Sequence, residues 1–398
     1  MKVLQICHKP PFPAKDGGTR AMHNITMGLI SRGHEVKVLT AYTHKHGFDL
    51  QKLPQEYVDQ TSIEAVFIDT RINAVEAFAS LITSDSYNVS RFFSADLDRK
   101  LTKLLRKEKF DIIHLESLFV TPYLGTIRRH SKAKVILRSH NIEYRIWREL
   151  AEGTRNMAKR AYLKYLANKL EEYERSVLEQ VDGIAAISSS DFENFKKLGY
   201  AKPMKNIPFG VQVSNNEYLK IPKEKGICYI GSMDWKPNAE GLVWFLEDVW
   251  PSIHKAHPDL IFYIAGKNMP EYLERLGTPN VNIVGEVPDA KAFLAKYEVS
   301  VVPLLMSGGL RIRVIEAMSI GSCVITTRSA AKGLHYEAGK HLLLADTASE
   351  FTAAIERALM IKGDAKVIGD SARLMIEDHY NIERVLNELE LLYSEVLA

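Results

Sequence analysis

The stretch VSVVPLLMSGGLRIRVIEAMSIGSCVITTR, residues 299–328, holds two short β-rich runs separated by a glycine loop and a helical pattern. The runs 299–305 and 322–328 predict buried strands, and the apolar residues between them recur at helical spacing. A strand, a crossover helix and a second strand form the unit from which parallel sheets are built. This stretch therefore predicts an α/β fold.

The same alternation of strands and helices extends over the whole chain. Because parallel sheets are covered by helices on both faces, the repeated pattern predicts two doubly wound, Rossmann-like parallel-sheet domains in tandem. Twelve runs are expected to form strands, namely 2–7, 34–42, 63–69, 110–117, 134–140 and 183–188 in the first half and 226–232, 260–266, 281–287, 299–305, 322–328 and 341–346 in the second.

A segment rich in Pro, Asn and Lys, residues 200–225, predicts the boundary between the domains. We expect domains at 1–205 and 206–378. The apolar spacing of the final segment, 379–398, predicts a helix that either completes the second domain or crosses back to the first. Since open sheets bind ligands beyond the carboxyl ends of their strands, the expected active site is a cleft between two facing domains.

Composition is that of a globular protein, with 46% hydrophobic and 25% charged residues. Cys7, Cys228 and Cys323 lie in separate apolar runs and predict buried, reduced thiols. The N-terminus does not resemble a signal peptide, and no apolar run reaches the roughly 18 residues of a membrane span. We expect a cytoplasmic protein, with peripheral contact at the inner face of the membrane as an open alternative.

Charge is unevenly distributed along the chain. Up to Lys205 there are 33 basic and 24 acidic residues, against 19 and 25 in the remainder. The basic residues concentrate in 99–109, 128–134 and 155–169, which are either solvated helix faces or contacts for an anionic membrane or acidic acceptor. No recognition motif accompanies the charge, so a nucleic-acid partner is not expected.

The loop before the helix at 312–319 combines glycines with cations. Gly308 and Gly309 would let a ligand approach the backbone N–H groups at the helix N-terminus, where the helix dipole favours an anion such as phosphate. Arg311 and Arg313 fall in the first helical turn, where a cation is unfavourable unless an anion binds beside it. A capping loop with two solvated arginines is the alternative.

The sequence Glu316-Ala317-Met318, followed by Gly321, resembles the signature of retaining glycosyltransferases of family 4. The resemblance extends over essentially the whole chain and implies the GT-B architecture of two facing Rossmann-like domains. Gly308 stands where that family usually has a first glutamate, so the stretch is similar to a subset with a GGxRxK-type loop. The resemblance implies that Glu316 binds the nucleotide ribose and that Gly308, Gly309, Leu310, Arg311 and Arg313 surround the donor.

The resemblance also implies roles for residues of the first half. Gly17 and Gly18, at an expected helix start, would bring backbone amides against the donor, although a flexible turn would explain them as well. His140 follows a strand at the edge that faces the expected cleft, and the resemblance implies that it contacts the donor sugar. A surface histidine is the alternative. Glu143 is a weaker candidate.

The second domain opens with GSMDWKPNAEGLVWF, where the resembled family usually has an arginine and a lysine for the diphosphate. Here Ser232 stands at the arginine position, and Lys236 lies nearby and would compensate together with the arginine pair. The run 207–211 resembles the family's hinge turn, with Gly210 in place and Phe209 instead of the usual asparagine.

The resemblance implies a retaining glycosyltransferase that moves a sugar from a nucleotide diphosphate sugar to a cell-surface polysaccharide or a lipid-linked glycan. No acidic cluster with the ligand spacing of a metal site is found after a predicted strand, so we expect no metal and no cofactor besides the donor. The alternative is a non-catalytic sugar-nucleotide-binding partner, suggested by Gly308 and Ser232. A nicotinamide oxidoreductase is not expected, because no G-x-G-x-x-G follows a predicted strand.

Overall fold

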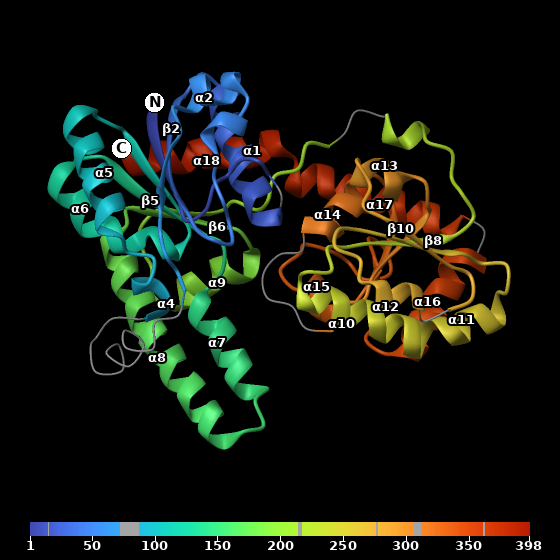
Figure 1. Ribbon diagram of the computed structural model, residues 1–398. Helices are drawn as coiled ribbons and strands as arrows, with labels where there is room; N and C mark the ends of the chain where they lie inside the picture. The colour runs from blue at the N-terminus through green and yellow to red at the C-terminus, as the bar shows by residue number, and fades with distance from the viewer. Residues whose placement is uncertain (15, 72–86, 214–216, 276–277, 306–311, 361–362) are drawn as a thin grey trace. The chain divides into compact units, whose positions relative to one another are not determined.

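The computed structural model describes residues 1–398 except 15, 72–86, 214–216, 276–277, 306–311 and 361–362. The chain divides into two compact units, one made of Met1–Gly210 with Val385–Ala398 and the other of Val211–Arg384. Each unit contains one parallel sheet with helices on both faces (Figure 1). The α/β class and the two Rossmann-like domains predicted from the sequence are thereby confirmed.

The sheet of the first unit has seven strands in the order β3-β2-β1-β4-β5-β6-β7, and all neighbours pair in parallel. Strand β7 was not predicted from the sequence, because it lies in the Pro- and Lys-rich segment expected to form the domain boundary. The strands are β1 (Lys2–Cys7), β2 (Glu35–Tyr42), β3 (Glu64–Phe67), β4 (Ile112–Glu116), β5 (Lys134–Ser139), β6 (Gly183–Ala186) and β7 (Met204–Asn206).

Helices of the first unit connect these strands and cover the sheet. They are α1 (Gly17–Ser31), α2 (Gln55–Thr61), α4 (Tyr87–Ser90), α5 (Ala95–Lys107), α6 (Leu124–His130), α7 (Glu143–Glu152), α8 (Met157–Gln180) and α9 (Ser189–Lys197), with short 3₁₀ helices η1 (Leu50–Lys52) and η2 (Leu118–Tyr123).

The last helix, α18 (Ile382–Leu397), begins in the second unit and belongs to the first from Val385 onward. Its apolar face is buried, as its strong amphipathic pattern dictates. Gly28 of α1 lets it approach closely, because a Cβ at Gly28 would lie 2.5 Å from the Leu386 Cδ1 atom. The first unit is therefore completed by the end of the chain.

The sheet of the second unit has six parallel strands in the order β10-β9-β8-β11-β12-β13. The strands are β8 (Ile227–Ile230), β9 (Phe262–Ala265), β10 (Val281–Gly285), β11 (Val299–Val302), β12 (Cys323–Thr326) and β13 (Leu343–Leu344). The helices are η3 (Tyr218–Lys220), α10 (Lys236–Trp244), the π-helical η4 (Phe245–Val249), α11 (Trp250–Ala256), α12 (Glu271–Arg275), α13 (Ala290–Ala295), α14 (Ile312–Ser319), α15 (Arg328–Ala331), α16 (Ala348–Met360) and α17 (Asp364–Tyr380).

Apolar side chains from both sheets and their helices form one core in each unit. Cys7, Cys228 and Cys323 are buried free thiols, which confirms their expected state. None of the helices in the described part of the chain combines the length and the apolar character that a bilayer crossing requires.

Strand order fixes where ligands are expected to bind. The direction of winding reverses between β1 and β4 in the first unit, and between β8 and β11 in the second. At such a point the loops after neighbouring strands turn to opposite faces of the sheet and leave a crevice at the carboxyl ends. The residues that follow β1, β4, β8 and β11 are therefore the ones to inspect.

Candidate functional site

A cluster of polar side chains lies at the carboxyl ends of β1, β4 and β5 in the first unit. Glu116 ends β4 and is fully buried, and the parallel register places it opposite Arg138 of β5. Glu116 Oε2 accepts a hydrogen bond from His140 Nε2 at 2.8 Å, and Oε1 accepts one from Gln5 Nε2 at 2.8 Å. His140, predicted as a site residue, is thus held by a buried carboxylate rather than lying free on the surface.

The charge of Glu116 determines which ring nitrogen of His140 carries the hydrogen and which can accept a hydrogen bond from a ligand. Burial alone would raise the pKa of Glu116, but the Arg138 guanidinium at 3.6 Å and the neighbouring histidines hold it well below its usual range. A carboxylate can only accept hydrogen bonds, so the ring hydrogen of His140 lies on Nε2. Burial lowers the pKa of His140 despite the Glu116 contact. The ring is therefore neutral, and its Nδ1 atom is a hydrogen-bond acceptor.

A second histidine lies beside His140 in this cluster. His8, directly after β1, donates from Nδ1 to the Glu116 carbonyl at 2.9 Å, and Ser117 Oγ lies 3.0 Å from the same nitrogen. Burial is the main cause that lowers the pKa of His8 to about 3, and the Lys9 ammonium acts in the same direction. The two imidazole rings meet edge to face with centroids 5.9 Å apart. His8 therefore packs against His140 as a neutral ring.

The cluster continues to the C-terminal helix. His114, two residues before Glu116 and so on the same face of β4, places Nε2 at 3.4 Å from Glu116 Oε1. Its Nδ1 atom lies 2.6 Å from the Tyr393 hydroxyl of α18. Glu116, His114 and Tyr393 were not predicted as site residues from the sequence. Polar residues inside the apolar strand 110–117 were the available signal, but only the strand register shows what they face.

The predicted helix start at Gly17 and Gly18 is the N-terminus of α1. Asp16 caps it by accepting from the Thr19 backbone N–H at 2.9 Å, while the Thr19 hydroxyl accepts from the Asp16 N–H. Lys9 Nζ lies 2.8 Å from both Asp16 oxygens, and a Cβ at Gly18 would lie 3.1 Å from that ammonium. A chain cation therefore lies against the glycine. The D-x-x-T spacing signals the cap, and the sequence analysis missed it.

Glu143, the weaker candidate, begins α7 next to a second buried carboxyl group. Glu174 of α8 accepts from the backbone N–H groups of Glu143 and Tyr144, both at 3.0 Å, and so caps α7. Burial raises the pKa of Glu143 to about 7 and that of Glu174 to about 8. Glu174 thus holds the start of α7, three residues after His140.

In the second unit, Arg313 reaches back from the first turn of α14 to the end of β8. Its Nη1 atom donates to the Ile230 carbonyl at 3.1 Å. A Cβ at the next residue, Gly231, would lie 2.8 Å from the same nitrogen and 2.1 Å from the buried Tyr229 hydroxyl. Gly266 approaches so closely that its Cβ would lie 1.6 Å from the Gly231 carbonyl oxygen. The guanidinium thus lies against a bare backbone at the β8 and β11 switch point.

Other predicted residues of the second unit lie nearby in sequence but make different contacts. The Ser232 hydroxyl donates to Asp234, and Asn238 Nδ2 donates to the Ser232 carbonyl at 2.8 Å. Lys236 opens α10 with an exposed side chain, 3.2 Å from Glu240 Oε1. Glu316 is 8% exposed in α14.

The remaining predicted contacts, Gly308, Gly309, Leu310 and Arg311, lie outside the described residues. The structure thus groups His140 with Lys9 and the α1 N-terminus in one unit. In the other unit it places Arg313 beside Gly231, the residue before Ser232, while Lys236 engages its own helix.

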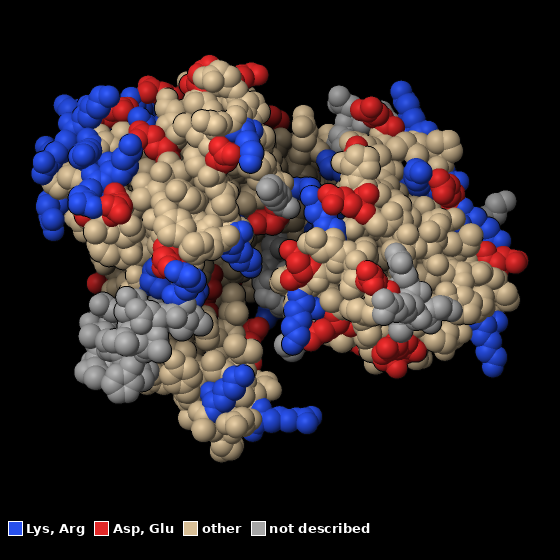
Figure 2. All heavy atoms as spheres, in the orientation of Figure 1, with Lys and Arg blue, Asp and Glu red and all other residues tan. Residues whose placement is uncertain are grey.

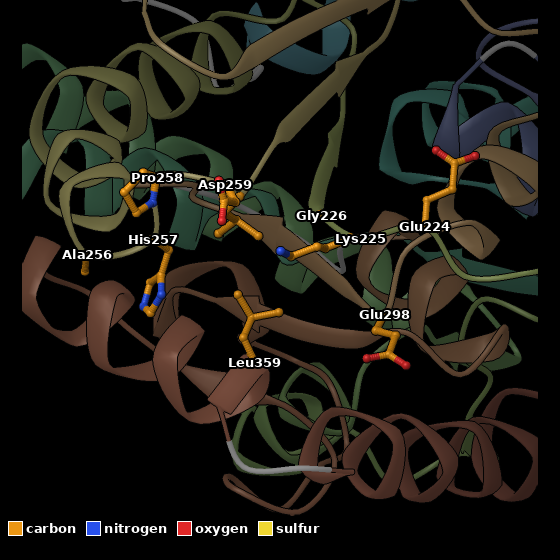
Figure 3. Close-up of a pocket in the computed structure, with 10 residues that line it drawn as sticks. Glu224, Lys225, Gly226, Ala256, His257, Pro258, Asp259, Glu298 and Leu359 are labelled. Carbon is orange, nitrogen blue, oxygen red and sulfur yellow. The ribbon is translucent and has the colours of Figure 1, made fainter.

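A cavity of about 410 Å³ in the second unit lies at the opposite edge of the sheet (Figure 3). Gly226, Leu260 and Glu298 line it, and each precedes a strand, which places the cavity at the amino ends of β8, β9 and β11. Its charged lining is mostly acidic, with three carboxylates against Lys225. No predicted site residue lines it. Within the described ranges, no three His, Cys, Asp or Glu side chains are arranged to hold a metal ion.

Family models match both halves of the chain. Residues 15–215 match the model described as Glycosyltransferase Family 4, and residues 224–360 match the one described as Glycosyl transferases group 1. The first match covers just over half of the chain and the two together cover most of it. The chain belongs to glycosyltransferase family 4.

Similar proteins share the full length of the chain. A curated relative from Klebsiella pneumoniae, an uncharacterized 44.6 kDa protein in the cps region, is 21% identical, with 98% of each chain covered. Sucrose-phosphate synthase from Thermosynechococcus elongatus has a TM-score of 0.69 at 16% identity, covering 100% of this chain and 99% of its own. The Anabaena protein HepE in complex with UDP has a TM-score of 0.64 at 12% identity, with 99% and 100% covered. These structures confirm the two-domain fold.

Proposed function

We propose that the protein is a retaining glycosyltransferase that moves a sugar from a nucleotide diphosphate sugar to a cell-surface polysaccharide or a lipid-linked glycan. The observation that carries this proposal is the position of Arg313. Its guanidinium lies at the switch point of the second sheet, where it donates to the Ile230 carbonyl and takes up, with the Tyr229 hydroxyl, the space that a side chain at Gly231 would need. Arginine binds phosphate groups with paired, charge-assisted hydrogen bonds.

Breaking the bond between sugar and phosphate develops negative charge on the departing diphosphate. Preorganised cations and N–H groups that meet this charge are the main source of catalysis in such reactions. Arg313, and Arg311 in the resembled subset, would serve this purpose without a metal. HepE, a structural neighbour, binds UDP, which supports a nucleotide diphosphate as the donor's leaving group.

His140 supports the sugar end of the proposal. Its Nε2–H is taken by Glu116, so its Nδ1 atom is available to accept a hydrogen bond from a hydroxyl group. A neutral acceptor suits a sugar hydroxyl better than a phosphate. We assign His140 to the donor sugar, Glu316 to the ribose hydroxyls, and Gly17 and Gly18 to backbone contacts with the donor.

The transferase can be distinguished from a non-catalytic sugar-nucleotide-binding partner, the alternative suggested by Ser232 and Gly308. The purified protein is first screened by thermal shift against nucleotides and nucleotide sugars. A ligand at a hundredfold excess over its dissociation constant stabilises the fold by about 2.7 kcal/mol. The stabilising sugar nucleotide is then incubated with the protein without acceptor. Slow release of free sugar supports the enzyme, whereas binding without any release supports the partner.

A further inference from the structure

Helices α7 and α8 form a helical hairpin, joined by residues 153–156, that extends away from the sheet of the first unit (Figure 1). Each helix has the other as its main packing partner. The root of the hairpin, with Tyr144 and Leu170, belongs to the core of the unit, whereas its far end does not. The side chains at the far end are therefore not required for the core of the unit.

Large apolar side chains are exposed at this far end. Met157 is 77% exposed, Leu150 46% and Tyr162 46%. On α8 the buried positions Leu163 and Ala167 face the hairpin partner, so Tyr162 and the residues around it point outward. Exposed large side chains of this kind, gathered at one end of an element, mark an interaction site rather than scattered surface residues.

Basic residues outnumber acidic ones around these apolar side chains, although the exposed Glu149 and Glu152 lie beside Leu150. Residues 144–169 contain seven basic and two acidic residues. Arg155, Lys159 and Lys164 are exposed and form no ion pair in the part of the chain that the structure describes, while Arg148, nearer the root, lies 2.7 Å from Glu171. Figure 2 shows lysine and arginine side chains at the free end of the hairpin.

The other basic runs of the first unit differ from the hairpin. Lysines and arginines gather over α5 and α6 (Figure 2), but the large apolar side chains of α5 are buried. Two of these cations, Arg106 and Lys107, lie in the last turn of α5, where a positive charge interacts favourably with the helix dipole. These two helices therefore have the character of solvated faces, and the hairpin end is the basic surface that also offers apolar contacts.

We infer that the end of the α7–α8 hairpin, with Leu150, Met157, Lys159, Tyr162 and Lys164, docks on an anionic membrane surface. A second copy of the chain is a poor occupant, because it would bring two cationic ends together. A bilayer with anionic lipids accepts both features, since apolar side chains enter the interface, tyrosine lies at the headgroup level and lysine meets lipid phosphates.

This surface would bring a membrane-borne acceptor close to the candidate site, an inference that rests on the proposed function. Helix α7 begins three residues after His140, and its ten residues span about 15 Å. A lipid-linked acceptor at the hairpin end would therefore need to reach only a short distance along α7 to the carboxyl edge of the sheet. Docking itself does not depend on the chemistry.

Co-sedimentation of the full chain with vesicles tests the inference. Vesicles of phosphatidylcholine and phosphatidylglycerol in equal parts are compared with phosphatidylcholine alone, without any sugar nucleotide. The variants are Lys159→Glu with Lys164→Glu, which reverses charge, and Leu150→Ser with Met157→Ser, which removes the apolar side chains. Lys103→Glu with Lys132→Glu, at exposed positions of the α5 and α6 region, is the control for net charge.

We expect the wild type to bind the anionic vesicles only. Each cation lost should weaken partitioning about fivefold, so the charge variant loses at least about 25-fold. The apolar variant should lose about tenfold, and the control should stay within about twofold. The inference is overturned if the wild type fails to bind, if the control loses as much as the charge variant, or if the apolar variant abolishes a self-association seen by sedimentation equilibrium. Donor hydrolysis without vesicles is measured separately, so that loss of one activity leaves the other proposal standing.

Discussion

At the scale of single residues, the candidate site depends on a buried carboxylate. Glu116 is surrounded by Gln5, Arg138 and His140, and each contact favours its ionised form. A substitution that removes the Glu116 charge would leave Arg138 buried without a counter-charge. The resulting loss of stability is commonly larger than the contribution of the ion pair itself. The more informative variant is therefore His140, which can be removed while Arg138 and Gln5 still hold Glu116.

His140→Ala should reduce the rate of donor hydrolysis by about a hundredfold, because one preorganised contact to the reacting sugar is lost. The melting temperature should fall only slightly, since Glu116 loses one of several hydrogen bonds. The rate is measured at saturating donor and compared with His130→Ala at the end of α6. An unchanged rate in His140→Ala, or an equal loss in the control, would contradict the role of His140.

His140 could be predicted from its place after an apolar strand, in the region of the expected cleft. Glu116 could not, because a single acidic residue at a strand end has many possible partners. Gln5, Glu116 and Arg138 lie on three different strands, and only the parallel register shows that they meet. The contact of Arg313 with the Ile230 carbonyl could not be predicted from the sequence either, although its position in the first turn of a helix was.

At the scale of elements, the root of the α7–α8 hairpin contains an unusual cap. Glu174 of α8 accepts from two backbone N–H groups at the α7 N-terminus, yet burial raises its pKa to about 8. A carboxyl group whose pKa is higher in the folded than in the unfolded state stabilises the fold most at low pH. That stabilisation is lost as pH rises through the folded-state pKa.

The free energy of unfolding of the wild type should therefore fall, relative to Glu174→Gln, as the pH rises from about 4.5 to about 8. The change should be on the order of a few kcal/mol. Urea unfolding across this range measures it, with the exposed Glu172→Gln as control. If the difference between wild type and Glu174→Gln is the same at every pH, Glu174 does not titrate in this way.

Most elements followed from local sequence patterns. The apolar runs predicted every strand of the described sheets except β7, because short buried strands bounded by turn residues carry a strong signal. Strand β7 has only three residues, none of them fully buried, and lies among prolines and lysines. The C-terminal helix was predicted, but its packing on the first unit was left open, because an amphipathic pattern does not identify the surface that it covers.

At the scale of the whole molecule, the first unit is made from both ends of the chain. Residues 385–398 contribute Val385, Leu386, Leu389, Leu392, Tyr393 and Val396, all buried, to that unit. Burying each contributes about 1.5 to 3 kcal/mol, so their sum is on the order of 10 kcal/mol. That is comparable to the net stability of an ordinary domain.

A fragment of residues 1–210 should therefore fail to fold, whereas the same fragment joined through a flexible linker to 385–398 should fold. Circular dichroism during heating distinguishes them, because only the second should show a cooperative transition. The joined fragment with Leu389→Asp serves as a control for the apolar contact. A cooperative transition of the short fragment at the temperature of the joined one would contradict this account of α18.

At this largest scale the two-domain fold could be predicted from the strand and helix units that repeat along the chain, and the family from the local signature Glu316-Ala317-Met318. The central claim of the account is narrower. It holds that the Arg313 guanidinium, beside Gly231, binds the diphosphate of a sugar nucleotide.

Calorimetric titration of UDP into the wild type, Arg313→Ala and Lys255→Ala tests this claim most directly. Lys255 is an exposed cation in the last turn of α11, near the amino edge of the same sheet, and controls for the loss of charge. A charge-assisted hydrogen bond contributes about 1.5 to 3 kcal/mol, so the account predicts that Arg313→Ala raises the Kd about tenfold to a hundredfold and that Lys255→Ala leaves it unchanged. Equal affinity of UDP for the wild type and Arg313→Ala would contradict it.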